Sequence, residues 1–156
     1  MKILMVCLGN ICRSPLAEGI LRTKLVAGNI NAIVDSAGTS GLHAGELPDE
    51  RMRSVAKSFG VNIDNLKSRK FTTSDFEDFD LIYAMDSSNL NNILTLAKTE
   101  RDISKVKLIL SELPDQNITE VPDPYYGGQQ GFIEVYNLLD AATDQIIEKL
   151  KENGKG

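Results

Sequence analysis

An apolar run at residues 3–8 ends abruptly at Gly9 and Asn10. Six consecutive apolar residues are typical of a strand that is buried on both faces, because a strand with one solvent face would alternate apolar and polar side chains. Such strands belong to parallel sheets, whose crossover helices cover both sides. The run therefore predicts a central strand in an α/β domain.

Helical and strand-like patterns alternate along the rest of the chain. Ser14 and Pro15 predict a helix start, as an N-cap followed by proline at the first helical position, and Gly28 ends that helix. Further strands are expected at residues 32–36, 80–85 and 106–110. Further helices are expected from Leu47-Pro48-Asp49 to Gly60, at residues 86–98, and along an apolar stripe from Phe132 to Leu150. This alternation predicts a single α/β domain over residues 1–156, with a parallel sheet covered by helices on both faces.

Composition removes several classes of function. The 156 residues include 17 Lys and Arg against 22 Asp and Glu, a net charge of −5, without a basic run. Neither a nucleic acid nor an anionic membrane surface is therefore an expected partner. The apolar run at residues 3–8 is far shorter than a membrane span, and we expect none. Two cysteines, Cys7 and Cys12, cannot supply a secreted disulfide framework, which favours a cytoplasmic location.

The segment between the first strand and the first helix has the composition of an anion site. A helix start presents unpaired N–H groups, and Gly9 and Asn10 tolerate the left-handed backbone that a loop around an anion needs. Arg13 adds a planar fork that pairs with two phosphate oxygens. A thiol at such a site, here Cys7, is expected to be largely thiolate and hence nucleophilic, with the Ser14 hydroxyl as a donor to it. The alternative, an apolar buried cysteine and a solvated arginine, explains fewer of these residues.

Four segments resemble the low-molecular-weight protein tyrosine phosphatases and occur in that family's order. They are VCLGNICRSP at 6–15, DSAGTSG at 35–41, AMD at 84–86 and DPYYG at 123–127. Together with the strand and helix alternation, the resemblance extends from residue 1 to about residue 151. It implies a four-stranded parallel sheet, a phosphate-binding loop after the first strand, and a two-step phosphatase mechanism that uses no metal or other cofactor.

The resemblance also implies a role for each matching residue. Cys7 is the expected nucleophile, forming a phosphocysteine, and Asp123 is the expected general acid and base. Asn10 and Ser36 match a polar pair that keeps the loop in shape. The phosphoryl group is held by Arg13 and by the loop residues Leu8, Gly9, Asn10, Ile11, Cys12 and Ser14. Without the cysteine loop, Asp123 would be interpreted as a turn residue between two prolines.

Residues at the mouth of the cleft are expected to set substrate preference. By resemblance, Tyr125 stacks on the aromatic ring of the substrate, and Tyr125 and Tyr126 are both candidates for phosphorylation. The alternative packs one or both tyrosines beside the terminal helix. Leu42 stands where several family members carry an aromatic wall, which leaves the peptide preference open. His43, the single histidine, lacks the spacing of a catalytic or metal site and is expected in a loop at the mouth.

These assignments predict hydrolysis of phosphotyrosine and small aryl phosphates, with tyrosine-phosphorylated proteins as substrates and phosphate or other oxyanions as inhibitors. A protein-arginine phosphatase is the alternative, although such enzymes typically carry threonine at the position of Ile11 and lack the paired tyrosines. An arsenate reductase of the same fold needs two further cysteines, and none follows Cys12. A non-catalytic phosphate-binding or redox-sensing module would lack Cys7, Arg13 or Asp123, and all three are present.

Cys12 has two interpretations. A loop folded around an anion bends back on itself, so that thiols at positions i and i+5 can lie close together. Peroxide would then convert Cys7 to a sulfenic acid, and Cys12 would condense with it to a disulfide that prevents further oxidation. In the other interpretation Cys12 is a small apolar side chain that fills the loop. The sequence predicts redox regulation only in the first case.

Overall fold

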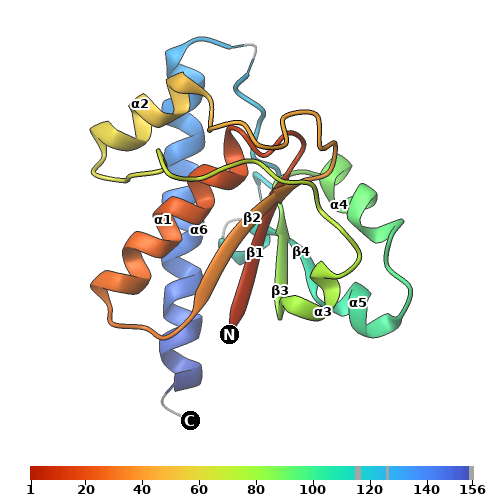
Figure 1. Cartoon of the computed structure of the whole chain (residues 1–156). Coiled ribbons are helices and arrows are strands. Elements are labelled where there is room, and N and C mark those ends of the chain that lie inside the picture. Colours follow the sequence, from red (N-terminus) through yellow and green to blue (C-terminus); the bar gives the residue numbers. More distant parts are fainter. Residues whose placement is uncertain (115–116, 126, 155–156) are drawn as a thin grey trace.

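The structure is a computed structural model that describes residues 1–114, 117–125 and 127–154. A four-stranded parallel sheet runs through its centre in the order β2-β1-β3-β4 (Figure 1). The strands are β1 (Lys2–Cys7), β2 (Ile33–Gly38), β3 (Leu81–Ala84) and β4 (Val106–Leu108). The expected α/β fold with a four-stranded parallel sheet is confirmed.

β1 lies inside the sheet because both of its faces are apolar. Ile3, Leu4, Met5 and Val6 are fully buried, and β1 pairs with β2 on one side and with β3 on the other. Successive side chains of a strand point to opposite faces. Ile3 and Met5 accordingly enter one hydrophobic cluster, and Leu4 and Val6 enter the other. Each such buried side chain contributes roughly 1.5–3 kcal/mol relative to exposure, so the run holds both layers to the sheet.

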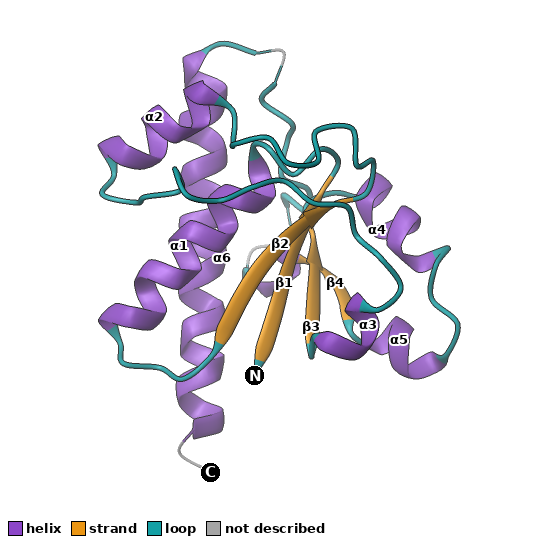
Figure 2. Cartoon of the chain, in the orientation of Figure 1, coloured by secondary structure: helices purple, strands orange, loops and turns teal. Residues whose placement is uncertain are grey.

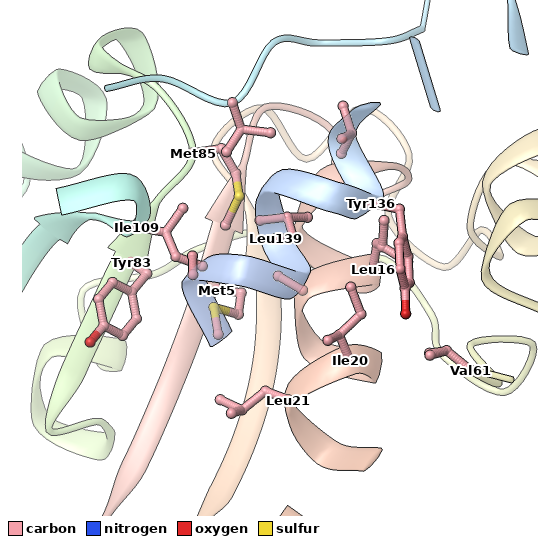
Figure 3. Packing of buried hydrophobic residues seen from close by; sticks show 14 of the residues in the cluster. Met5, Leu16, Ile20, Leu21, Val61, Tyr83, Met85, Ile109, Tyr136 and Leu139 are labelled. Carbon is pink, nitrogen blue, oxygen red and sulfur yellow. The ribbon is translucent and has the colours of Figure 1, made fainter. Parts of the chain in front are cut away.

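Helices cover both faces of the sheet, as expected (Figure 2). One layer contains α1 (Arg13–Ala27), α2 (Glu50–Ser58) and the long α6 (Gln129–Gly154), and the other contains α3 (Asp75–Asp78), α4 (Ser87–Leu94) and α5 (Glu100–Ser104). Figure 3 shows the first layer, where Met5 of the sheet lies near Ile20 of α1 and Leu139 of α6, and Tyr83 lies beside Ile109 in the same cluster. In the described part of the chain, no helix is both long enough and apolar enough to cross a membrane.

Several boundaries differ from those expected. β1 ends at Cys7, one residue early, because the chain leaves the sheet there and Leu8 is 45% exposed. β4 ends at Leu108, because the next two residues enter a 3-10 helix, η1 (Ile109–Glu112), and pack in the cluster that includes α6. α4 ends at Leu94 and not at residue 98. The sequence did not predict α3 and α5, whose four and five residues are too short to leave a helical period.

The carboxyl end of β1 is the point where the strand order reverses, since the chain passes from β1 to β2 on one side and later to β3 on the other. Ligands of open α/β sheets bind at such a point. The end of β2 lies directly against the loop that follows β1. A Cβ atom at Gly38 would be 2.8 Å from the Leu8 carbonyl oxygen and 3.0 Å from the Asn10 nitrogen. Only glycine allows this close approach of the two segments.

Candidate active site

A cavity of about 210 Å³ opens at the carboxyl end of β1. It is lined by nine of the predicted site residues, namely Cys7, Leu8, Gly9, Ile11, Cys12, Arg13, Leu42, Asp123 and Tyr125, together with Ser40 and His43. The other three, Asn10, Ser14 and Ser36, are buried and joined to one another by hydrogen bonds. Within the described residues, no group of three or more His, Cys, Asp or Glu side chains is arranged to hold a metal ion.

The loop between β1 and α1 leaves its own amides unused. Among the described residues, the N–H groups of residues 8–13 donate to no protein acceptor. The carbonyls accept instead: those of Cys7, Leu8 and Ile11 from the N–H groups of Thr39, Ser40 and Asp49 (3.0, 3.0 and 2.7 Å), and that of Gly9 from the Ser68 hydroxyl (3.0 Å). Most backbone N–H groups in folded proteins have a partner, so six consecutive unused ones form an anion-binding concavity.

The start of α1 adds to this concavity. The helix begins at Arg13 with Cys12 as its N-cap, and no side chain of the described residues caps it. The expectation that Ser14 is the N-cap is therefore wrong. Its hydroxyl lies 3.0 Å from Cys7 Sγ and accepts from Asn10 Nδ2 (2.7 Å). An uncapped helix start keeps its N–H groups and its positive dipole end for an anion.

A chain of buried polar side chains supports the loop from below. Ser36 Oγ donates to Glu18 Oε1 (2.6 Å) and accepts from Asn10 Nδ2 (3.0 Å). The other hydrogen of the Asn10 amide goes to Ser14 Oγ (2.7 Å). The single proton of the Ser14 hydroxyl is shared between the Ala37 carbonyl (3.4 Å) and Cys7 Sγ, which lies closer at 3.0 Å. These hydrogen bonds thus connect the Glu18 carboxylate to the Cys7 thiol.

The direction of these hydrogen bonds is fixed at Asn10. Its Oδ1 accepts from the Arg69 N–H (3.0 Å), which orients the amide so that its NH2 group faces the two serines. Asn10 also has a positive φ of 56°, a left-handed conformation that asparagine tolerates better than most residues. The pair of Asn10 and Ser36 expected from the sequence is therefore in direct contact.

Arg13 is buried and held between two carboxylates. Its Nη1 donates to Asp86 Oδ2 (2.6 Å) and to the Val121 carbonyl (2.9 Å), and its Nη2 lies 3.8 Å from Asp123 Oδ2. Asp86 is itself fixed as the N-cap of α4, because its Oδ1 accepts from the Asn89 N–H (2.8 Å). Arg13 also lines the cavity, so the guanidinium donors that these contacts leave over are available to an anion there.

The segment around Asp123 forms the opposite wall. It is anchored at Val121, whose N–H donates to the Met85 carbonyl (2.8 Å). Asp123 Oδ1 accepts from the Tyr125 N–H (3.0 Å), so the aspartate makes the turn that one interpretation expected and still lines the cavity. Tyr125 lines the cavity too and is 36% exposed, and stacking of its ring on a substrate stays a prediction. The expectation for Tyr126 lies outside the described residues.

Leu42 and His43 form the mouth of the cavity. Leu42 is 83% exposed, and its side chain there is aliphatic. His43 Nδ1 pairs with Glu46 Oε2 (2.6 Å), and its ring packs on the loop, since a Cβ at Gly9 would be 3.0 Å from its Cδ2 atom. His43 therefore lies where the sequence analysis expected it.

Cys12 shares the cavity with Cys7, and both are free thiols. Burial raises the pKa of the Cys12 thiol strongly, and the negative charges of Asp49, Cys7 and Asp123 raise it further. Cys12 is therefore protonated near neutral pH. That the loop brings the two thiols close enough to form a disulfide stays a prediction.

Sequence reasoning missed four residues that support the site. Glu18 accepts a hydrogen bond from Ser36, and Asp86 accepts one from Arg13. Ser68 and Arg69, from a distant segment, donate hydrogen bonds to the loop. Two of them left a signal. Glu18 is a carboxylate within a stretch of α1 that is otherwise suited to burial. Asp86 lies two residues after the end of β3, in the AMD segment at 84–86 that carried the resemblance, but it was given no role. Ser68 and Arg69 stand in a polar stretch with no distinguishing pattern.

Comparison with known proteins gives a consistent answer. Residues 2–156 match the family described as low molecular weight phosphotyrosine protein phosphatase. This chain belongs to that family. A putative low molecular weight protein-tyrosine-phosphatase of Synechocystis is 44% identical over 152 residues, which cover 96% of each chain. Membership confirms the resemblance drawn from four short segments and makes the chain an enzyme of the protein tyrosine phosphatase class.

Solved structures agree with this placement. A protein tyrosine phosphatase of Entamoeba histolytica, with Hepes in its active site, is 42% identical, with a TM-score of 0.93 over 99% of each chain. A Drosophila arginine phosphatase is 34% identical, with a TM-score of 0.91 over 97% of this chain and 98% of that one. The same fold is therefore found in proteins named for two different phosphorylated side chains.

The buried carboxyl of Glu18 predicts a specific dependence of stability on pH. Burial raises its pKa above the usual 4.5, and the hydrogen bond from Ser36 and the charge of Arg22 oppose this only in part. Since the folded chain binds this proton more tightly than the unfolded chain, the stability from this group is complete below about pH 4.5 and is lost as the pH rises through the folded value.

Glu18→Gln does not titrate and supplies the control. The free energy of unfolding of the wild type minus that of the variant should fall with rising pH and then level off. Urea unfolding of both proteins from about pH 4 to about pH 8 measures this difference. A difference that stays flat or increases with pH would contradict the effect of burial.

Proposed function

We propose that this enzyme hydrolyses phosphotyrosine and small aryl phosphate monoesters through a phosphocysteine intermediate. The observation that carries the proposal is one cavity that contains the Cys7 thiol, the buried Arg13 guanidinium and the Asp123 carboxyl, with unused loop amides around the thiol. Nucleophile, anion site and proton donor are the three parts that covalent phosphoryl transfer needs.

In the first step, the Cys7 thiolate attacks phosphorus. The S–P bond forms as the bond from phosphorus to the phenolic oxygen breaks, and Asp123 gives its proton to that oxygen. The amides of residues 8–13 and Arg13 stabilise the charge on the three phosphoryl oxygens, while Asp86 keeps Arg13 in place. Ser14, oriented by Asn10, stabilises the attacking sulfur by its hydrogen bond.

In the second step, Asp123 acts as a carboxylate and takes a proton from water. The water oxygen attacks phosphorus, the P–S bond breaks, and inorganic phosphate leaves the Cys7 thiolate behind. Asp123 ends the cycle protonated, ready for the next leaving group. The Ser14 hydroxyl again stabilises the sulfur, now as a leaving group. Phosphate and similar oxyanions should therefore inhibit by occupying the loop.

Phosphoarginine is the second candidate substrate, because a Drosophila arginine phosphatase has this fold with a TM-score of 0.91. Two features of the cavity favour phosphotyrosine. Ile11, which lines it, is apolar where arginine phosphatases typically carry threonine, and Tyr125 offers a ring to an aromatic substrate. The arsenate reductase alternative is not supported, because the sequence has no cysteine after Cys12.

The substrate and the nucleophile are tested together. Wild-type enzyme should hydrolyse a phosphotyrosine peptide faster than phosphoserine and phosphoarginine peptides, since a long aromatic side chain reaches Cys7 past Tyr125. Cys7→Ser should lose more than roughly a thousandfold in turnover and still bind phosphate, because the anion is held by amides and Arg13. Faster hydrolysis of phosphoarginine would select the second candidate. Substantial activity of Cys7→Ser would rule out the nucleophile.

The role of Asp123 is tested through the leaving group. In Asp123→Ala, kcat should fall by about a hundredfold or more for aryl phosphates with poor leaving groups and much less for good ones, because only a poor leaving group needs a proton. The bell-shaped pH dependence of kcat/KM in the wild type should lose its basic limb in the variant. A loss that is equal for all leaving groups would show that Asp123 is not the general acid.

We also propose that Cys12 protects Cys7 from irreversible oxidation. Peroxide converts the Cys7 thiolate to a sulfenic acid, the Cys12 sulfur then attacks it, and the S–S bond forms as water leaves. Wild-type enzyme inactivated by peroxide should recover with dithiol, whereas Cys12→Ser should stay active before treatment and recover poorly after it. Equal recovery would leave Cys12 as a packing residue.

Activity requires reduced thiols, so the cytoplasm is the proposed compartment.

A further inference from the structure

Arg51, in the first turn of α2, makes an unusual set of contacts for an exposed arginine. Its Nη2 donates to the Tyr125 carbonyl (2.8 Å), and its Nε and Nη2 fork onto the Asp49 carboxylate (3.2 and 3.1 Å). Its guanidinium carbon lies 4.6 Å from the ring centre of Phe132 and 5.4 Å from that of Tyr125. A planar guanidinium that is forked, stacked and bonded to a carbonyl is held in one orientation.

These contacts connect the two walls of the cavity. On one side, the Asp49 N–H donates to the Ile11 carbonyl (2.7 Å), and the Asp49 carboxylate caps α2 through the Arg51 N–H (2.8 Å). On the other side, the Tyr125 residue that accepts from Arg51 donates its own N–H to Asp123 Oδ1 (3.0 Å). One guanidinium therefore ties the segment of the general acid to the phosphate loop.

The position of Asp123 depends on anchors on both sides of it. Two residues before it, Val121 is fixed to Met85 and Arg13. Two residues after it, Tyr125 is fixed to Arg51. The Asp123 side chain itself is 39% exposed, so its direction depends on the peptide groups that flank it. Loss of the second anchor would allow the carboxyl to move away from the leaving oxygen, and misplacement by about 1 Å can cost a hundredfold in rate.

We propose that Arg51 is a positioning residue, which holds the 123–125 segment at the distance from the phosphate loop that proton transfer from Asp123 requires. The inference rests on the proposed function, because it needs Asp123 to be the general acid. Arg51 acts through the Tyr125 carbonyl and not through contact with the substrate. Its positive charge is a separate effect, which a lysine would retain without the planar fork.

The test compares Arg51→Met with Arg53→Met, using kcat for aryl phosphates that differ in leaving-group acidity. Arg53 is the matched control, because it stands on the same turn of α2 and also donates to a backbone carbonyl, that of Pro48 (3.0 Å). Arg51→Met should lose roughly ten- to a hundredfold for poor leaving groups and little for good ones. Inhibition by inorganic phosphate should change less than about twofold, because the loop amides remain in place. Arg53→Met should match the wild type throughout.

Two further variants separate the possible explanations. In the Asp123→Ala background, Arg51→Met should add less than about a twofold loss, since no acid is left to position. Arg51→Lys should behave more like Arg51→Met than like the wild type. If Asp123→Ala shows no dependence on the leaving group, the proposed function fails. If Asp123→Ala does depend on the leaving group, the proposed function stands. The inference on Arg51 is then overturned if Arg51→Met slows all substrates equally or slows none, or if Arg51→Lys is as active as the wild type.

Discussion

A loop that offers its N–H groups to an anion cannot use them to hold its own shape. Most loops and turns rely on backbone amides for that purpose, but residues 8–13 leave theirs without a protein acceptor among the described residues. The loop is held by its carbonyls and by the Asn10 side chain, which keeps a left-handed backbone at φ 56°. The support therefore comes from outside the loop, which explains the close approach of Gly38 and the buried serines.

The buried charge of Arg13 also needs support from outside the loop. A buried guanidinium without a partner is strongly destabilising, by about 3–5 kcal/mol in comparable cases. Asp86 meets this need at 2.6 Å from Arg13 and is itself fixed at the start of α4. Asp123 lies farther from Arg13, at 3.8 Å, and has the more exposed side chain. The two carboxylates therefore differ in their contact with Arg13: Asp86 is hydrogen-bonded to it, whereas Asp123 lies beyond hydrogen-bond distance.

What could be predicted from the sequence was what lies close together in it. Residues 3–15 contain a strand, an anion loop and a helix start in succession, so Cys7 and Arg13 could be placed from local patterns alone. The contacts of Ser14 could not be predicted in this way. Its position in the sequence is that of a helix cap, but its hydroxyl accepts a hydrogen bond from Asn10, which is oriented by the backbone of Arg69. Hydrophobic period indicates which face is buried, not which distant polar group lies against it.

The predicted ends of strands were wrong for a related reason. At β4, the apolar run continues through Leu110, yet the strand stops at Leu108 because Ile109 and Leu110 are buried in the layer of α6. An apolar pattern records burial and does not distinguish a strand from the helical turn that follows it. By contrast, the bounds of β1 were missed by a single residue, because Gly9 and Asn10 mark the turn that leaves the sheet.

The cavity has a buried floor and an exposed rim, and this division explains how one fold occurs in proteins named for tyrosine and for arginine. The floor, made of Cys7, Asn10, Arg13, Ser14 and Ser36, is buried and hydrogen-bonded, so a change there disturbs both the loop and the core. Rim residues such as Leu42 and Leu8 are 83% and 45% exposed and contribute little to stability. The buried residues are thereby tied to the fold, whereas residues at the mouth can change at little cost to it.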